Sequence, residues 1–211
     1  VGGFLGWGQG TLIAKLGLPP FLVTLSGLFL CRGIALAISR ESVQIEHPFF
    51  RTLTNWSVSL PAKASLSLGS IVFILVVVGG MVLARQSRFG RTVYAIGGNA
   101  NSAELMGLPV RRTLVWTYVL SGMCAGLGGV LFALYTSSGN AISGTGLELD
   151  AIATVVIGGT LLSGGYGSVL GTLLGVLTLG VVQTAITFMG TLSSWWTRIV
   201  IGTLLLFFML V

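Results

Sequence analysis

Charged side chains are scarce in this chain, and acidic ones are the scarcest. Asp and Glu together number five, Lys and Arg number eleven, and the charged fraction of the 211 residues is 8%. Soluble globular domains carry roughly 25%. Hydrophobic residues make up 54% of the chain, and the mean hydropathy is +0.97. The composition excludes an ordinary soluble domain and predicts a protein that crosses a membrane several times.

The chain also lacks the residue patterns of common catalytic sites. Its one histidine, His47, has no second His, Cys or acid at ligand spacing, so we predict no metal site. No GxxxxGK[ST] phosphate loop is present, and the glycine-rich stretches lack the lysine that would contact phosphate. We therefore predict no catalytic residue and no bound cofactor, and any energy source would be another chain.

The positions of the cysteines and of the basic residues argue against two further classes of protein, disulfide-stabilised proteins and nucleic-acid-binding proteins. Cys31 and Cys124 lie inside apolar segments, which favours buried thiols over a disulfide framework. The formal charge of +6 comes from residues at the expected helix ends, and no basic face studded with aromatic residues accompanies them. We read the charge as a topology signal and predict no nucleic-acid partner.

The apolar runs predict an all-α, polytopic transmembrane bundle. A span needs roughly 20 apolar residues. Residues 1–14 form the end of one helix before Lys15, and the last helix starts near Trp195. The apolar segments between them are 21–39, 66–84, 113–135, 149–162 and 169–189. Segment 149–162 is short, a Gly/Ser-rich break at 163–168 follows it, and the sequence leaves open whether it crosses the membrane.

The ends of the chain predict a piece of a longer protein. The sequence starts at Val1 without a Met or a charged leader, and it stops inside the apolar run LLLFFMLV. We expect residues 1–211 to form a single transmembrane domain, truncated at both ends.

Residues 85–112 form a basic loop that sets the orientation. Short basic loops beside spans stay in the cytoplasm. With this loop inside, Lys15 is also inside, whereas residues 40–63 and 136–148 are outside. The arginines of the loop are Arg85, Arg88, Arg91, Arg111 and Arg112.

A very short helix is expected at the centre of this loop. Asn101-Ser-Ala-Glu104 has the spacing of a capping box, and Gly107 with Pro109 would end the helix. Leu105 and Met106 give it an apolar face. Because so short a helix is unstable alone, we expect it to dock into a groove on another protein. In the alternative, a merely solvated loop, Leu105 and Met106 would be exposed without a reason.

Three strings resemble the membrane permeases of bacterial ABC importers for monosaccharides, the ribose and galactose group. They are PPFLVTLSGLFLCRG, RFGRTVYAIGGNANSAELMGLPV and GLELDAIATVVIGGTLLSGGYGSVLGTLLG. ESVQIEHP and the run from ELDAIATVVIGGTLLSGG to GTLSSWWTRIVIG are most similar to a permease subunit of the galactofuranose importer. The resemblance implies the ribose-permease type of fold, with about ten spans in the intact subunit.

The resemblance also implies partners and a docking site. The partners are an ATP-binding cassette ATPase that uses ATP and Mg, a second permease subunit in a heterodimer, a periplasmic sugar-binding protein and the lipid of the bacterial inner membrane. Residues 85–112 become the cytoplasmic coupling loop, whose helix seats in a cleft of the ATPase. The matching residues are Asn99, Asn101, Ser102, Ala103, Glu104, Leu105, Met106 and Gly107.

Polar groups within the spans are candidates for a sugar pathway or gate, because they are costly in lipid. Arg32 could contact sugar or pair with a carboxylate for packing. Glu148 and Asp150 begin the short segment, where the helix dipole favours acids, so capping is as reasonable as a gate. The remaining candidates, which could instead serve helix packing, are Thr24, Asn140 and Gln183.

Two further readings complete the prediction. Gly167, Gly171 and Gly175 recur every four residues and predict a smooth helix face that packs against another helix. The rival function is a secondary transporter or channel that works without an ATPase. Such proteins often carry ionisable groups deep in the membrane, and the apolar segments here hold almost none, which weighs against it.

Overall fold

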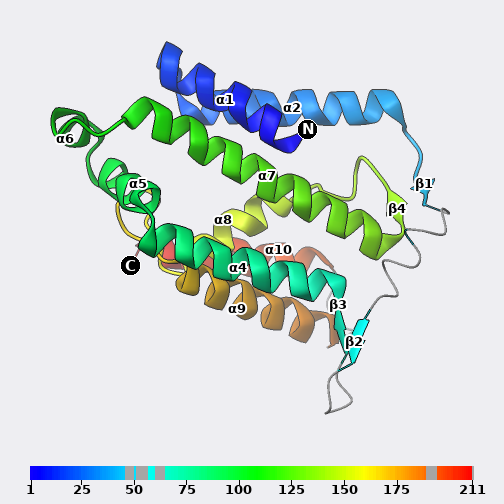
Figure 1. Cartoon of the computed structure of the whole chain (residues 1–211). Helices are drawn as coiled ribbons and strands as arrows, with labels where there is room; N and C mark the ends of the chain where they lie inside the picture. Colours follow the sequence, from blue (N-terminus) through cyan, green and yellow to red (C-terminus); the bar gives the residue numbers. More distant parts are fainter. Residues whose placement is uncertain (46–49, 51–56, 60–64, 189–193, 211) are drawn as a thin grey trace. The chain divides into compact units, whose positions relative to one another are not determined.

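The computed structural model describes all residues except 46–49, 51–56, 60–64, 189–193 and 211, and the described part is mainly helical (Figure 1). It forms two compact units, each built from segments distant in sequence. The first unit contains Val1–Val76 and Pro109–Ser143, and the second contains Val77–Leu108 and Gly144–Val211. The prediction of an all-α bundle is confirmed. His47, for which no metal site was predicted, lies outside the described residues.

Three long helices make up most of the first unit: α1 (Gly2–Leu16), α2 (Pro20–Ile38) and α7 (Val110–Thr136). Gly17 ends α1 in the left-handed conformation, with φ of +64°, and its N–H donates to the carbonyl of Ile13. Pro20 starts α2 because its ring presets a helical φ and its missing N–H is not needed in the first turn. These helices match the predicted segments to within three residues.

Glycine allows α1 and α7 to approach backbone to backbone. Gly2 faces Gly122, Gly6 faces the carbonyl of Tyr118, and Gly10 faces Val115. Residue numbers rise along α1 as they fall along α7, so the two helices are antiparallel. Lys15 therefore lies at the same end as the start of α7, as predicted.

Two short ribbons join the ends of the helices. β1 (Val43–Gln44) pairs antiparallel with β4 (Ser138–Gly139), which places the loop after α2 and the loop after α7 on the same side, as predicted. β2 (Ser57–Ser59) pairs with β3 (Ser65–Ser67), directly before α4 (Leu68–Gln86). The expectation that residues 40–63 form only a loop was wrong at these strands, whose pairing depends on partners outside that segment.

The described part of the second unit contains the later part of α4 and five further helices. They are α5 (Arg88–Gly98), α6 (Ala100–Leu105), α8 (Leu147–Ile157), α9 (Val169–Phe188) and α10 (Ser194–Leu210). Ala153 of α8, Leu179 of α9 and Ile201 of α10 are buried together in a small core. The described start of α10 confirms the prediction near Trp195.

Helix α8 is a half-length helix packed on α9. The carbonyl of Gly158 lies against Gly171, and the carbonyl of Thr154 lies against Gly175, so the helices are antiparallel. The predicted smooth face is confirmed at Gly171 and Gly175. Helix α8 has 11 residues and ends at Ile157, not at Leu162 as predicted. At about 1.5 Å per residue it is too short for a hydrocarbon core about 30 Å thick.

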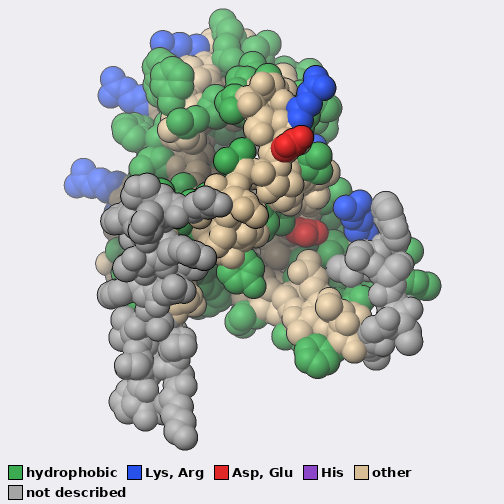
Figure 2. Space-filling view, turned by 90° about the vertical axis from the view of Figure 1, so that its right-hand side faces the viewer, with side chains coloured by type: hydrophobic (Ala, Val, Ile, Leu, Met, Phe, Trp, Pro, Cys, Tyr) green, Lys and Arg blue, Asp and Glu red, His purple; other side chains and the backbone are tan. Residues whose placement is uncertain are grey.

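Among the described residues, four helices are long and apolar enough to cross a membrane: α2, α4, α7 and α9. Helix α4 buries none of its side chains. Hydrophobic side chains are likewise spread over the face shown in Figure 2. In lipid such helices need no protein cover, because the acyl chains are as apolar as the side chains.

The glycine contact between α1 and α7 predicts that Gly122→Leu destabilises the protein. The new side chain would meet the backbone of Gly2 and Gly6. Overpacking of this kind costs about 1–3 kcal/mol and should lower Tm by about 5 °C in detergent. The matched control is Gly128→Leu on the same helix, where a Cβ has open space. Equal Tm values for the two variants would contradict the packing argument.

Candidate functional site

Helix α5 is the first element of the candidate site, and the sequence did not predict it. Ser87 caps its N-terminus by accepting a hydrogen bond from Gly90 N at 2.9 Å, and the same hydroxyl donates to Leu83 O at 2.6 Å. Gly90 is buried against the carbonyls of Leu83 and Ala84. The start of α5 is thereby fixed to the end of α4. A serine before an apolar pattern was the local signal available in the sequence.

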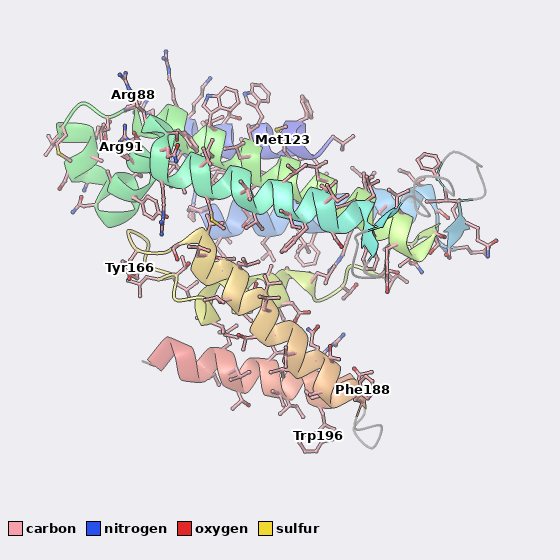
Figure 3. The ribbon with its side chains drawn as sticks, turned by 60° about the horizontal axis from the view of Figure 1, so that its bottom comes forward. Arg88, Arg91, Met123, Tyr166, Phe188 and Trp196 are labelled. Atoms are coloured by element: carbon pink, nitrogen blue, oxygen red, sulfur yellow. The ribbon has the colours of Figure 1, made fainter. Side chains whose placement is uncertain are left out.

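The two faces of α5 differ sharply in polarity. Phe89, Val93 and Ile96 are half-buried, whereas Arg88 and Arg91 are exposed (Figure 3). A helix with one apolar and one cationic face is suited to a membrane surface, where the cations meet the headgroups. The first part of the basic loop, residues 88–98, is therefore an ordered helix and not an extended segment.

Helix α6 is capped by Asn99. The Oδ1 atom of Asn99 accepts a hydrogen bond from Ser102 N at 2.9 Å. The predicted capping box beginning at Asn101 was wrong, because Asn101 lies inside the helix. Asn99 has an extended backbone, with φ of −159°, and also ends α5. One residue thus separates the two helices, and that junction decides which asparagine becomes the cap.

The end of α6 was predicted correctly. Gly107 has φ of +77°, a conformation that favours glycine. Gly107 N donates to Glu104 O at 2.9 Å, and Leu108 N donates to Ala103 O at 3.0 Å. These two bonds form a Schellman motif, which satisfies carbonyls that the helix itself leaves open.

The side chains of α6 point in two directions. Ala103 is fully buried, whereas Leu105 is 89% exposed and Met106 is 69% exposed. Two adjacent large apolar side chains are therefore held outward by a rigid turn. Ser102 and Glu104 are also exposed. The expected apolar face of the short helix is confirmed.

An unpredicted contact ties α5 to the connection between α8 and α9. Tyr94 Oη donates a hydrogen bond to Gly167 O at 3.0 Å. A Cβ on Gly97 would lie only 2.6 Å from the backbone nitrogen of Gly165. The paired glycines at 97–98 and 164–165 were the only sign of this contact in the sequence, and a glycine pair alone does not identify its partner.

Two pathway candidates of the first unit, Thr24 and Asn140, form local hydrogen bonds with the backbone. Thr24 Oγ1 donates to Pro20 O at 2.9 Å within α2, and Asn140 Oδ1 accepts from Ile142 N at 2.9 Å. Arg32 lies half-buried on α2. An open cavity of about 580 Å³ lies one turn further along α2, and Arg32 is not among the residues that line it. The lining residues are Gly33, Leu36, Ala37, Arg40 and Ile142.

The acidic pathway candidates of the second unit, Glu148 and Asp150, lie in the first turn of α8. Glu148 Oε2 accepts a hydrogen bond from Gly146 N at 3.2 Å, which supports the capping role. Asp150 follows in the same first turn of α8. Because Gly158 faces Gly171 and Thr154 faces Gly175, extending the antiparallel register by two turns brings the start of α8 level with Gln183. This level lies before the end of α9 at Phe188.

Residues 1–209 match the family model described as "Branched-chain amino acid transport system / permease component". The chain belongs to this family. Its predicted place in the bacterial inner membrane is confirmed by this membership and by the four apolar helices of the described part. No solved structure matches the chain.

Several curated proteins are similar over almost the whole chain. An inner membrane ABC transporter permease protein of Escherichia coli K12, YjfF, is 52% identical over 95% of this chain and 60% of its own length. The fructose import permease protein FruG of Bifidobacterium longum is 40% identical over 99% of this chain and 63% of its own. The ribose import permease protein RbsC of Bacillus subtilis is 34% identical over 94% and 61%. The chain thus spans about 60% of the length of these relatives, and the similarity agrees with membership of the permease family.

The cap geometry predicts different effects of two asparagine substitutions. Asn99→Ala removes the N-cap of α6 and should destabilise that helix by about 1 kcal/mol. Asn101→Ala should not, because Asn101 is an exposed interior residue and alanine favours helix. Hydrogen–deuterium exchange of residues 100–107 is expected to quicken about fivefold in Asn99→Ala alone. Faster exchange in Asn101→Ala would instead support the capping box.

Proposed function

We propose that the intact protein is a transmembrane permease subunit of an ATP-driven importer and carries a monosaccharide into the cell, with galactofuranose or a closely related sugar as its substrate. The observation that carries this proposal is α6, where Leu105 and Met106 stand outward on a capped turn. An apolar pair in this position suits a groove on another protein.

The ATPase partner is supported by the chemistry of the chain. The sequence has no phosphate-binding loop of its own, so a separate ATP-binding cassette ATPase would bind ATP and Mg. Residues 99–107 would seat in that ATPase. Movement of the ATPase on hydrolysis would then shift α6 and change which side of the pathway is open.

A neutral substrate fits the polar groups of the helices. Arg32, Glu148, Asp150 and Gln183 can all form hydrogen bonds with hydroxyls. Charged residues are few in the apolar helices, which weighs against ion coupling. Weak contacts are sufficient, because tight binding would slow release into the cell. Two relatives named for fructose and ribose import support a sugar, and the resemblance of ESVQIEHP and the later run supports galactofuranose.

Further partners follow from the same proposal. A periplasmic sugar-binding protein would deliver the substrate at the side that carries β1 and β4. A second, different permease subunit would complete the pathway and cover part of the exposed apolar surface, with membrane lipid covering the rest.

The proposal is tested with the intact permease in vesicles, together with its ATPase and a panel of binding proteins loaded with galactofuranose, galactopyranose, ribose or fructose. We expect the largest stimulation of ATP hydrolysis and uptake with galactofuranose. If only another sugar stimulated ATP hydrolysis and uptake, that sugar would replace galactofuranose as the proposed substrate. Uptake that needs no ATPase would overturn the importer and favour a secondary transporter or channel.

Docking of α6 predicts opposite results for two substitutions of one residue. Met106→Asp would place a charge in an apolar groove and should weaken ATPase binding at least about tenfold, since an unpaired buried charge costs more than 1.4 kcal/mol. Met106→Leu keeps an apolar side chain of similar size and should bind like the parent. The measurement is co-purification and titration of the ATPase. Normal binding by Met106→Asp would remove α6 from the interface.

A further inference from the structure

The contact between α5 and the α8–α9 connection has no role in the function described so far. It is formed by Tyr94 and Gly97 on α5 and by Gly164, Gly165 and Gly167 on the connection, and we name these five residues the clasp. The yellow connection runs beside α5 in Figure 1. All five residues belong to the second unit.

Backbone touches backbone in the clasp. A Cβ on Gly97 would lie 2.6 Å from Gly165 N and 3.2 Å from its Cα, and a Cβ on Gly164 would lie 2.7 Å from Gly97 O. Gly164 and Gly165 also have φ of +91° and +79°. Glycine is thus required on both sides, so a displacement of α5 is passed directly to the connection without a flexible side chain between them.

One end of the clasp leads to the ATPase docking helix. Helix α5 is a single regular helix of 11 residues, and Asn99 joins it to α6 as the cap of both. Ala103 of α6 is fully buried. With Ser87 and Gly90 holding its start against α4, α5 can act as a lever that pivots at its first turn.

The other end leads to α8 through a hydrogen-bonded connection. Thr160 N donates to Val155 O at 3.1 Å, Gly164 N to Leu161 O at 3.0 Å, and Leu161 N to Tyr166 O at 3.1 Å. These bonds continue from the last turn of α8 to the clasp. The first turn of α8 holds Glu148 and Asp150, so a movement passed through the connection would reach these two carboxylates.

We propose that the clasp is the mechanical link that passes movement of the ATPase-docked helix α6 to α8 and thereby to the substrate gate. Tyr94 and Gly97 are positioning residues in this proposal, because they act through α8 and do not touch the sugar. The inference rests on the proposed function. The inference adds one defined structural element, the clasp. Its position would depend both on the state of the ATPase site and on the state of the gate.

The test uses a reporter on α8 in the intact permease bound to its ATPase. Cys31 and Cys124 are replaced by serine, and Leu149→Cys, at a position that is 61% exposed, supplies the reporter thiol. The rate of thiol labelling is measured with and without ATP, beside ATPase binding, ATP hydrolysis and sugar uptake. The reporter should change its labelling rate several-fold with ATP.

Gly97→Ala is compared with Gly98→Ala, where a Cβ meets nothing within 4 Å. We expect Gly97→Ala to bind the ATPase and hydrolyse ATP, yet to lose the ATP-dependent change in labelling and about tenfold in uptake. Gly98→Ala should match the parent. Equal labelling responses in the two variants would overturn the clasp alone. A parent that binds no ATPase would overturn both this inference and the proposed function.

A second, more conservative pair of variants keeps the test valid if Gly97→Ala misfolds. Tyr94→Phe removes only the hydroxyl that donates to Gly167 O, and Tyr166→Phe makes the same change at a side chain that is 71% exposed (Figure 3). Loss of one hydrogen bond should lower the labelling response about fivefold in Tyr94→Phe only. An unchanged response in Tyr94→Phe would overturn the proposal even if Gly97→Ala failed to insert.

Discussion

Close approach of backbones at glycine is the constraint on which the rest of this structure depends. In lipid, apolar side chains gain little by leaving the solvent, so helices associate through van der Waals contact at short range. Gly6 and Gly122 provide that contact between α1 and α7, and Gly158 and Gly171 provide it between α8 and α9. A side chain at these positions would separate the helices.

The same constraint makes a half-length helix possible. Helix α8 is too short to cross the membrane, but its glycine contacts fix its position along α9. Its first turn, with Glu148 and Asp150, is thereby level with Gln183 of α9. Polar groups at the end of a short helix are tolerated where they line a cavity or contact protein. The position of this turn beside α9 gives the proposed gate its physical basis.

Local signals were sufficient for part of the candidate site and insufficient for the rest. The stop at Gly107 and the exposure of Leu105 and Met106 follow from short-range chemistry, and both were predicted. The cap was misplaced by two residues, because Asn99 and Asn101 are equally suitable caps in isolation. Only the end of α5 decides between them.

The sequence by itself determined the membrane class and the positions of the long helices, because composition and the length of apolar runs are local properties that membrane insertion requires. The permease family was indicated by the resemblance of its motifs. Tertiary structure decided the early end of α8, the pairing of β1 with β4 and the contact of Tyr94 with Gly167. Each of these joins or limits segments through a partner distant in sequence. The sequence of a glycine position or a short strand does not indicate which distant segment it contacts. Only the folded structure identifies that partner.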